Sequence, residues 1–206
     1  PAPSGRALGT EVEILCDGRP QGRIVFGDAV RPEAAAAVAA LRRLGVRAVL
    51  LTGDAPLPAR IAAAAADLAE VEASCRPDRK LERVRTDHSG AIAMAGDGIN
   101  DGPALAAADL GIATGNASDL ARCSGNVLLP DGDLRKIPWL ISLGRATRSA
   151  VRQNFAFAFA YNGIAVAAAA AGLLTPVLAA AAMALSGATL AANSLRLSRF
   201  PAPERE

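Results

Sequence analysis

The chain has 206 residues, a length that allows one or two domains, and 51% of its residues are apolar. Its formal net charge is only +2, and its arginines are scattered rather than gathered in one stretch, which argues against a nucleic-acid partner. The three cysteines stand alone, without a C-x-x-C or C-P-C pair, which argues against a disulfide framework.

Charged residues divide the chain into two parts. They are frequent before residue 154 and absent from residues 154–195, a run of 42 residues. We therefore expect a soluble part followed by a membrane part.

The soluble part alternates short apolar runs with segments of helical pattern. We expect strands at residues 23–26, 46–51, 91–95, 110–113 and 127–129. We expect helices at residues 32–44, about 57–68, about 77–85 and around 103–108. This alternation predicts an α/β fold with a Rossmann-like parallel sheet and helices on both faces. In such sheets, ligands bind beyond the carboxyl ends of the strands.

Two polar features follow strands or open helices in this part. Thr52-Gly53-Asp54 places a hydroxyl and a carboxylate directly after an apolar run, and Lys80 lies near the start of the helix expected at 77–85. Taken alone, a T-G-D sequence is often only a turn, and a single lysine is most often a solvated helix residue. Their order along the chain gives them weight, because a third motif follows.

The third motif is G-D-G-I-N-D-G-P at residues 96–103, directly after the strand expected at 91–95. Two acids, an amide and three glycines in eight residues exceed what any turn needs. Asp97 and Asp101 lie four residues apart across the glycine-rich turn, so both carboxylates could face one point, and hard oxygen ligands suit Mg²⁺. A nearby lysine would neutralise phosphate charge, and these are the main requirements of phosphoryl transfer.

These motifs, in this order, resemble those of the haloacid dehalogenase superfamily and, within it, of the P-type ATPases. Residues 28–32 are similar to the family's D-x-x-R-P stretch, residues 52–54 to its T-G-D, and residues 95–105 to its G-D-G-x-N-D-A-P-A-L signature. Gly102 stands where alanine is usual. The resemblance covers residues 23–197, which is nearly the whole chain.

The resemblance implies a phosphate site that uses ATP as substrate and Mg²⁺ as cofactor. Asp97 would hold Mg²⁺, with Asp101 as a second candidate ligand. The implied catalytic set is Thr52, Gly53, Asp54, Lys80, Asn100 and Asp101.

The aspartate that the family phosphorylates, in D-K-T-G-T, does not occur in this sequence. The only D-x-D, at Asp131 and Asp133, lies downstream of the other motifs and has Arg135 where threonine or valine is wanted, so we interpret it as a loop. We expect residues 1–22 to end a nucleotide-binding region or linker and residues 23–133 to be the C-terminal part of a phosphorylation domain. The N-terminal part of the same pump would then be a partner of this chain. The alternatives are a membrane-anchored phosphatase of the superfamily and a non-catalytic remnant that binds Mg²⁺ or a partner.

Two apolar runs are each long enough to cross a hydrocarbon core of about 30 Å. They predict transmembrane helices at residues 154–174 and 177–195, after a linking helix at 134–153 and before a tail at 196–206. Core helices of a soluble protein are the alternative, because both runs are rich in alanine. Arginines precede and follow the pair, but none lies in the turn between them, so the positive-inside rule puts both chain ends in the cytosol. We therefore expect a multi-pass protein of the cell membrane that contacts lipid.

Polar side chains within membrane helices are costly and are candidates for function. Tyr161, Asn162, Met183 and Ser186 are the candidates for binding a transported cation, and this set of groups suits a soft ion such as Cu⁺. Close packing through small residues is the alternative for Ser186. The pair Tyr161-Asn162 resembles the copper-transporting branch of the heavy-metal P-type ATPases. That branch carries M-x-x-S-S, whereas Gly187 replaces the second serine here. The resemblance still implies Cu⁺ as the transported metal, because the zinc branch expects an acid in this helix.

Overall fold

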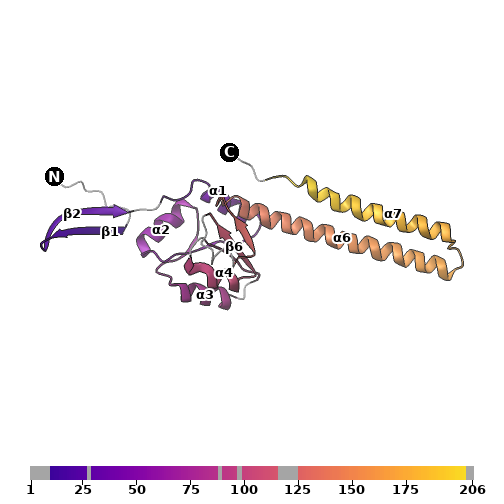
Figure 1. Ribbon diagram of the computed structural model, residues 1–206, viewed down its shortest axis with the longest axis horizontal. Helices are drawn as coiled ribbons and strands as arrows, with labels where there is room; N and C mark the ends of the chain where they lie inside the picture. The colour runs from indigo at the N-terminus through magenta and orange to yellow at the C-terminus, as the bar shows by residue number, and fades with distance from the viewer. Residues whose placement is uncertain (1–9, 27–28, 88–89, 97–98, 116–124, 203–206) are drawn as a thin grey trace. The chain divides into compact units, whose positions relative to one another are not determined.

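The computed structural model describes residues 10–26, 29–87, 90–96, 99–115 and 125–202 (Figure 1). The chain forms two compact units, residues 1–138 and 139–206. The first unit holds a β-hairpin and the α/β elements, and the second holds most of two long helices.

The first unit begins with an antiparallel hairpin of β1 (Thr10–Cys16) and β2 (Arg19–Phe26), as Figure 1 shows. Asp17 and Gly18 form the turn with φ of 49° and 75°, which are the positive values that a tight two-residue hairpin requires. We expected one short strand at 23–26 and a domain boundary between residues 22 and 23. That boundary falls within β2, and the first strand of the hairpin was missed.

The α/β elements follow the expected order except for one strand at residues 70–72, which was not predicted. They are α1 (Ala34–Arg43), β3 (Val49–Leu51), α2 (Pro56–Ala65), β4 (Glu70–Glu72), α3 (Pro77–Thr86), β5 (Ala93–Gly96), η1 (Ile99–Asp101), α4 (Gly102–Ala107), β6 (Leu110–Thr114) and β7 (Val127–Leu129). Strand β3 pairs in parallel with β4, and β5-β6-β7 form a second parallel sheet. The predicted parallel α/β fold is confirmed, with its described strands in two sheets.

The core of this unit lies where α4 packs against β6. Leu105 is fully buried and clusters with Val84, Met94, Ala104 and Ala113, and Ile112 of β6 is also fully buried. Gly111 allows the close approach, because a Cβ atom there would lie 2.4 Å from the backbone carbonyl oxygen of Leu105. The tight packing fixes the start of α4 relative to the sheet, and the G-D-G-I-N-D-G-P segment leads directly into α4.

The second unit contains a helical hairpin, and Figure 1 shows its two helices side by side. Helix α6 (Lys136–Ala170) begins in the first unit and continues through the second, and α7 (Pro176–Leu195) is followed by η2 (Arg196–Arg199). We expected a linking helix to end at residue 153 and a separate helix to follow. Neither proline nor glycine lies near that position, so nothing in the sequence interrupts the helix there. Gly172, at φ 73°, follows the end of α6, and Thr175 caps the start of α7 by accepting a hydrogen bond from the Leu178 amide.

Among the described residues, one helix is long and apolar enough to cross a membrane, and it spans Pro176–Arg199. No residue in its apolar window is buried, unlike the core helix of a soluble protein. The first half of α6 carries Arg145, Arg148 and Arg152, and its second half carries Asn154 and Asn162. These polar groups lower its apolar content, so the span predicted at residues 154–174 is not confirmed.

Candidate functional site

The Thr52-Gly53-Asp54 motif forms a closed turn at the carboxyl end of β3. The Thr52 hydroxyl donates to Asp54 Oδ2 over 2.7 Å, and the Asp54 amide donates back to Thr52 Oγ1 over 3.2 Å. Both side chains are therefore held close to the backbone at this end of the strand.

Backbone hydrogen bonds tie this turn to the segment after β4. The Cys75 amide donates to the Thr52 carbonyl over 2.8 Å, and the Ser74 amide donates to the Asp54 carbonyl over 2.7 Å. Burial raises the pKa of the Cys75 thiol, and the carboxylate of Glu72 raises it further. The T-G-D turn is thus held from two directions, by its own side chains and by the neighbouring strand end.

Lys80 and Asp101 form an ion pair although they are 21 positions apart in sequence. Lys80 Nζ lies 2.8 Å from Asp101 Oδ1, and the two side chains are only 15% and 12% exposed. Pro77 occupies the first turn of α3, where its missing amide costs no hydrogen bond, and it sets the start of the helix that carries Lys80. A largely buried ion pair is costly to desolvate, so its retention here favours a role other than stability alone.

Gly96 makes room for the carboxylate of Asp101. A Cβ atom at residue 96 would lie 2.7 Å from Asp101 Oδ2 and 3.1 Å from its Cβ. One carboxylate oxygen of Asp101 therefore faces Lys80, and the other faces the end of β5. Glycine is therefore required at residue 96, because the Asp101 side chain approaches its backbone closely.

The structure brings together some of the predicted site residues. Thr52 contacts Asp54, and Lys80 contacts Asp101, but no hydrogen bond joins these two pairs in the part of the chain that the structure describes. Asn100 lies exposed in η1, and Gly53 is exposed between Thr52 and Asp54. The principal Mg²⁺ ligand expected from the sequence, Asp97, lies outside the described residues.

The chemistry of the described groups fits a magnesium site in part. Carboxylate oxygens are the ligands that Mg²⁺ takes in proteins, and Asp101 Oδ2 is not used by Lys80. Within the described ranges, no group of three or more His, Cys, Asp or Glu side chains is placed to hold a metal ion.

Arg31 is a residue whose position was not foreseen. Its guanidinium donates to the carbonyl of Gly132, and a Cβ atom at Gly115 would lie 3.8 Å from it. Arg31 thus ties the segment before α1 to the loops that follow β6 and β7. The R-P step of the D-x-x-R-P stretch was the signal that could have assigned this anchoring role.

The two carboxylates of the D-x-D sequence at 131–133 are each paired with a basic side chain. Asp133 accepts from Arg135 and Asp131 accepts from Lys136, and these hydrogen bonds hold the pKa of both carboxyl groups below its usual range. This agrees with the interpretation of the sequence as a loop.

In the second unit, polar side chains join the start of the uncharged run in α6 to its end in α7. Asn193 Nδ2 donates to Asn154 Oδ1 over 2.8 Å, and Asn154 Nδ2 donates to Ser194 Oγ over 3.0 Å. Asn193 also donates to the Ala150 carbonyl over 3.4 Å. These contacts fix the register of the two helices.

Among the residues expected to bind a transported cation, Tyr161 contacts the other helix of the hairpin. The Tyr161 hydroxyl lies 3.5 Å from Thr189 Oγ1, Asn162 is exposed, and Met183 is 77% exposed. Ser186 is half-buried in α7. These positions do not test whether the four side chains share a cation, so the cation-site prediction stays a prediction.

Comparison with known proteins shows which families this chain is similar to. Residues 3–109 match the family model of haloacid dehalogenase-like hydrolases. The chain is 45% identical over 193 residues to a copper-exporting P-type ATPase of Mycobacterium tuberculosis, which covers 93% of this chain and 25% of that protein. It is 43% identical over 200 residues to a probable copper-transporting ATPase of Synechococcus elongatus, covering 93% of this chain and 27% of that protein.

A solved structure extends the likeness to both units. The crystal structure of a zinc-transporting PIB-type ATPase in the E2.Pi state matches with a TM-score of 0.83 at 36% identity, over 94% of this chain and 32% of that one. This chain therefore spans about a quarter of the length of the curated relatives it matches. These matches confirm the resemblance to heavy-metal P-type ATPases drawn from the motifs.

Proposed function

Because the chain belongs to the haloacid dehalogenase-like hydrolase family, we propose that it forms the C-terminal part of a membrane pump that uses ATP to move a soft heavy-metal cation. The phosphorylated aspartate would lie in a segment of that pump outside this sequence. The observation that carries the proposal is the Lys80–Asp101 pair, held at 2.8 Å beside the end of β5 in the same chain as the apolar helix α7.

The phosphate site would work by positioning and charge neutralisation. Lys80 would neutralise charge on the phosphoryl group, and the Thr52 hydroxyl would donate to one of its oxygens. Asp97 would hold Mg²⁺ with support from Asp101, and the ion would offset the negative charge that phosphoryl transfer moves between oxygens. Before ATP binds, the ion pair would keep Lys80 and Asp101 oriented. A phosphate that competes for the Lys80 ammonium would then release Asp101.

The described strands leave a place for the segment that would carry the phosphorylated aspartate. In the part of the chain that the structure describes, β3 pairs only with β4, and β5 pairs only with β6. Both β3 and β5 are therefore edge strands of their described sheets. A parallel strand inserted between β3 and β5 would pair with the free edge of each and complete one continuous sheet. Its carboxyl end would lie between Thr52 and Asp101.

The membrane part would consist of two spans, residues 154–174 and α7, with both chain ends in the cytosol. Arginines flank the pair, and the turn at residues 171–175 carries no charge. Asn154 and Asn193 mark the cytosolic edge of the pair, because they bond to each other next to these arginines. A cytosolic site for ATP requires this orientation.

Cu⁺ is the cation that we propose, with Tyr161, Asn162, Met183 and Ser186 as candidate ligands. A thioether, an amide and hydroxyl groups suit a soft monovalent ion, and α7 carries no acid. Copper is named in both curated relatives above, whereas the matched solved structure transports zinc. The proposal of Cu⁺ therefore rests on these side chains rather than on the family.

ATP hydrolysis separates this proposal from a membrane-anchored phosphatase. The purified 206-residue chain should hydrolyse neither ATP nor a phosphate ester, because the nucleophile is supplied by another segment of the pump. Hydrolysis by this chain alone, lost in Asp101→Asn, would favour the phosphatase and contradict the pump.

The role of Met183 tests the metal assignment in the complete pump. If its sulfur binds the cation, Met183→Leu and Met183→Ala should lower metal-stimulated ATP turnover equally, because leucine keeps the volume and lacks the sulfur. Phosphorylation by inorganic phosphate should be unchanged in both variants. Activity at the unsubstituted level in Met183→Leu would assign Met183 to packing instead.

A further inference from the structure

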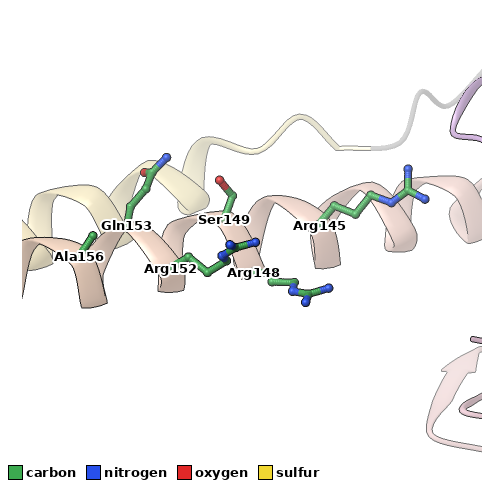
Figure 2. A pocket seen from close by; sticks show the side chains of 6 residues that line it. All are labelled: Arg145, Arg148, Ser149, Arg152, Gln153 and Ala156. Carbon is green, nitrogen blue, oxygen red and sulfur yellow. The ribbon is translucent and has the colours of Figure 1, made fainter.

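The hollow on α6 beside the start of the uncharged run is a second candidate binding surface. It has a volume of about 570 Å³ and is open to solvent, and Figure 2 shows the side chains that line it. These are Arg145, Arg148, Ser149, Arg152, Gln153 and Ala156. Neither the phosphate site nor the candidate metal ligands include any of them.

We propose that Arg148 and Arg152, with Ser149 and Gln153, bind the phosphate of an anionic phospholipid headgroup. The inference rests on the proposed function in one respect, namely that the helix pair crosses a membrane. It adds a lipid as a specific ligand of this chain and goes beyond the contact with bulk lipid that any membrane helix makes.

The spacing of the four polar residues builds a site with two different edges. At about 100° per residue, Arg148 and Arg152 project within about 40° of each other around the helix. Ser149 and Gln153 follow each arginine by one residue and form the other edge, as Figure 2 shows. Arg148, Ser149 and Arg152 are exposed. Guanidinium groups form paired hydrogen bonds with phosphate oxygens, and the hydroxyl and amide can donate to the remaining oxygens.

The depth of the site matches a lipid headgroup. Arg152 and Arg148 precede Asn154, the first residue of the uncharged run, by two and six positions, which is about 3 Å and 9 Å along the helix. The interfacial layer of a bilayer extends roughly 5–8 Å beyond each side of the hydrocarbon core, so a headgroup phosphate lies at this level. Ala156, at the membrane end of the hollow, leaves space where acyl chains would begin.

The arginine edge of the hollow faces away from α7. Ala150 is 3% exposed, and its carbonyl accepts from Asn193 of α7. Arg148 and Arg152 flank Ala150 by two residues on either side, which puts them about 160° from it around the helix. The partner helix of the hairpin therefore leaves the two arginines accessible.

The sequence around the site favours an anion. No Asp or Glu occurs from residue 134 to residue 203, so the described helices α6, α7 and η2 carry no carboxylate side chain that could neutralise Arg148 and Arg152. Basic residues at a membrane surface each strengthen binding to anionic lipids about fivefold. Diffuse attraction of this kind would involve every arginine at this level, whereas a built site depends on Arg148 and Arg152.

The structure offers a matched pair of arginines for distinguishing these cases. Arg196 and Arg199 in η2 follow Ser194, which bonds to Asn154, so they lie at a comparable depth. They do not line the hollow. Replacing either pair by glutamine removes two positive charges at the same level of the helical hairpin.

Energy transfer from the single tryptophan measures the lipid preference. Trp139 lies nine residues before Arg148 on α6 and would donate to dansyl-labelled lipids in phosphatidylcholine vesicles that hold the 206-residue chain. We expect stronger transfer to dansyl-phosphatidylglycerol than to dansyl-phosphatidylcholine, reversed by unlabelled phosphatidylglycerol. Arg148→Gln with Arg152→Gln should weaken this preference at least about fivefold, while Arg196→Gln with Arg199→Gln should change it less than about twofold.

Each other outcome overturns the inference in a recognisable way. If both double variants lose the lipid preference equally, the preference comes from diffuse charge. If Arg148→Gln with Arg152→Gln keeps the full preference, the site is excluded. Competition by inorganic phosphate as strong as that by the lipid would indicate a site for free phosphate. A preference seen in this chain but absent from the complete pump would show that other helices cover the hollow. Absence of energy transfer to either lipid would instead contradict the membrane assignment itself. As a control, transfer to dansyl-phosphatidylcholine shows that each variant has inserted into the vesicles.

Discussion

The ion pair between Lys80 and Asp101 should contribute strongly to the stability of the first unit. Lys80→Met leaves the Asp101 carboxylate without its cation in a place where Asp101 is only 9% exposed. Breaking a buried ion pair by removing one partner costs about 3–5 kcal/mol. We expect the lower end of that range, about 3 kcal/mol, because each side chain keeps more than a tenth of its surface in water. This loss lowers the folding equilibrium constant more than about 100-fold.

The double variant separates pairing from burial. Asp101→Asn together with Lys80→Met leaves no unpaired charge, so it should be destabilised by only about 1 kcal/mol. The sum of the two single losses should exceed that of the double variant by about 2 kcal/mol or more. The coupling exists only if the two groups contact each other in solution, as they do over 2.8 Å in the structure.

The buried thiol of Cys75 provides the assay. Cys75 is 4% exposed, so a thiol reagent can label it only when the surrounding structure opens. With Cys16 and Cys123 replaced by serine, the labelling rate in the 206-residue chain, divided by the rate of the same variant unfolded in urea, gives the opening equilibrium. The reasoning would be refuted if the stability loss of the double variant equalled the sum of the two single losses. It would also be refuted if the opening equilibrium of each single variant differed from that of the parent by less than about threefold.

Three further predictions follow from particular contacts. Gly111→Ala should destabilise the first unit by about 2 kcal/mol, because its Cβ would lie 2.4 Å from the Leu105 carbonyl, whereas Gly144→Ala, with nothing within 4 Å, should leave thermal unfolding of that unit unchanged. A cysteine at Thr175 should react with an impermeant thiol reagent only from the side opposite the cytosol, and labelling from the cytosolic side alone would reverse the topology. Burial raises the pKa of the Cys75 thiol, so its contribution to stability is complete below the ordinary thiol pKa and is lost as the pH rises through the raised value. Urea unfolding at increasing alkaline pH should show this loss, and Cys75→Ala should remove it; an unchanged pH profile in the variant would contradict the assignment.

The sequence motifs predicted a phosphate site because their residues are unusual for turns, and that site stays a prediction. T-G-D and G-D-G-I-N-D-G-P concentrate acids and glycines directly after apolar runs, and a parallel sheet brings such strand ends to one edge. The pairing of Lys80 with Asp101 could not be derived in this way. It depends on how α3 packs beside η1, and local patterns carry no information about contacts between elements 21 residues apart.

The hairpin at residues 10–26 was missed although its turn carries a recognisable signal. Asp17-Gly18 is a typical two-residue hairpin turn, and strands of opposite direction flank it. Residues 11–14 of β1 alternate acidic and apolar side chains, whereas the first half of β2 does not alternate. The turn together with the alternation in β1 could have identified the element.

The long helix α6 shows the limit of composition as a guide to boundaries. The charge pattern changes at residue 154, but the helix continues, because neither glycine nor proline lies near that position. Composition thus indicates where a helix changes environment, whereas glycine and proline indicate where it ends. Gly172 and Pro176 mark the one interruption between α6 and α7, and this turn was predicted correctly.

Formation of a phosphoenzyme in the complete pump is the most direct test of the account. Incubation with ATP labelled at the γ-phosphate should give an acid-stable phosphoprotein whose formation requires Mg²⁺ and Cu⁺, and Asp97→Asn and Asp101→Asn should each lower its yield, the former more severely. Label that forms without a soft metal ion, or that is unaffected by both substitutions, would contradict the central claim that this chain completes the phosphate site of a metal pump.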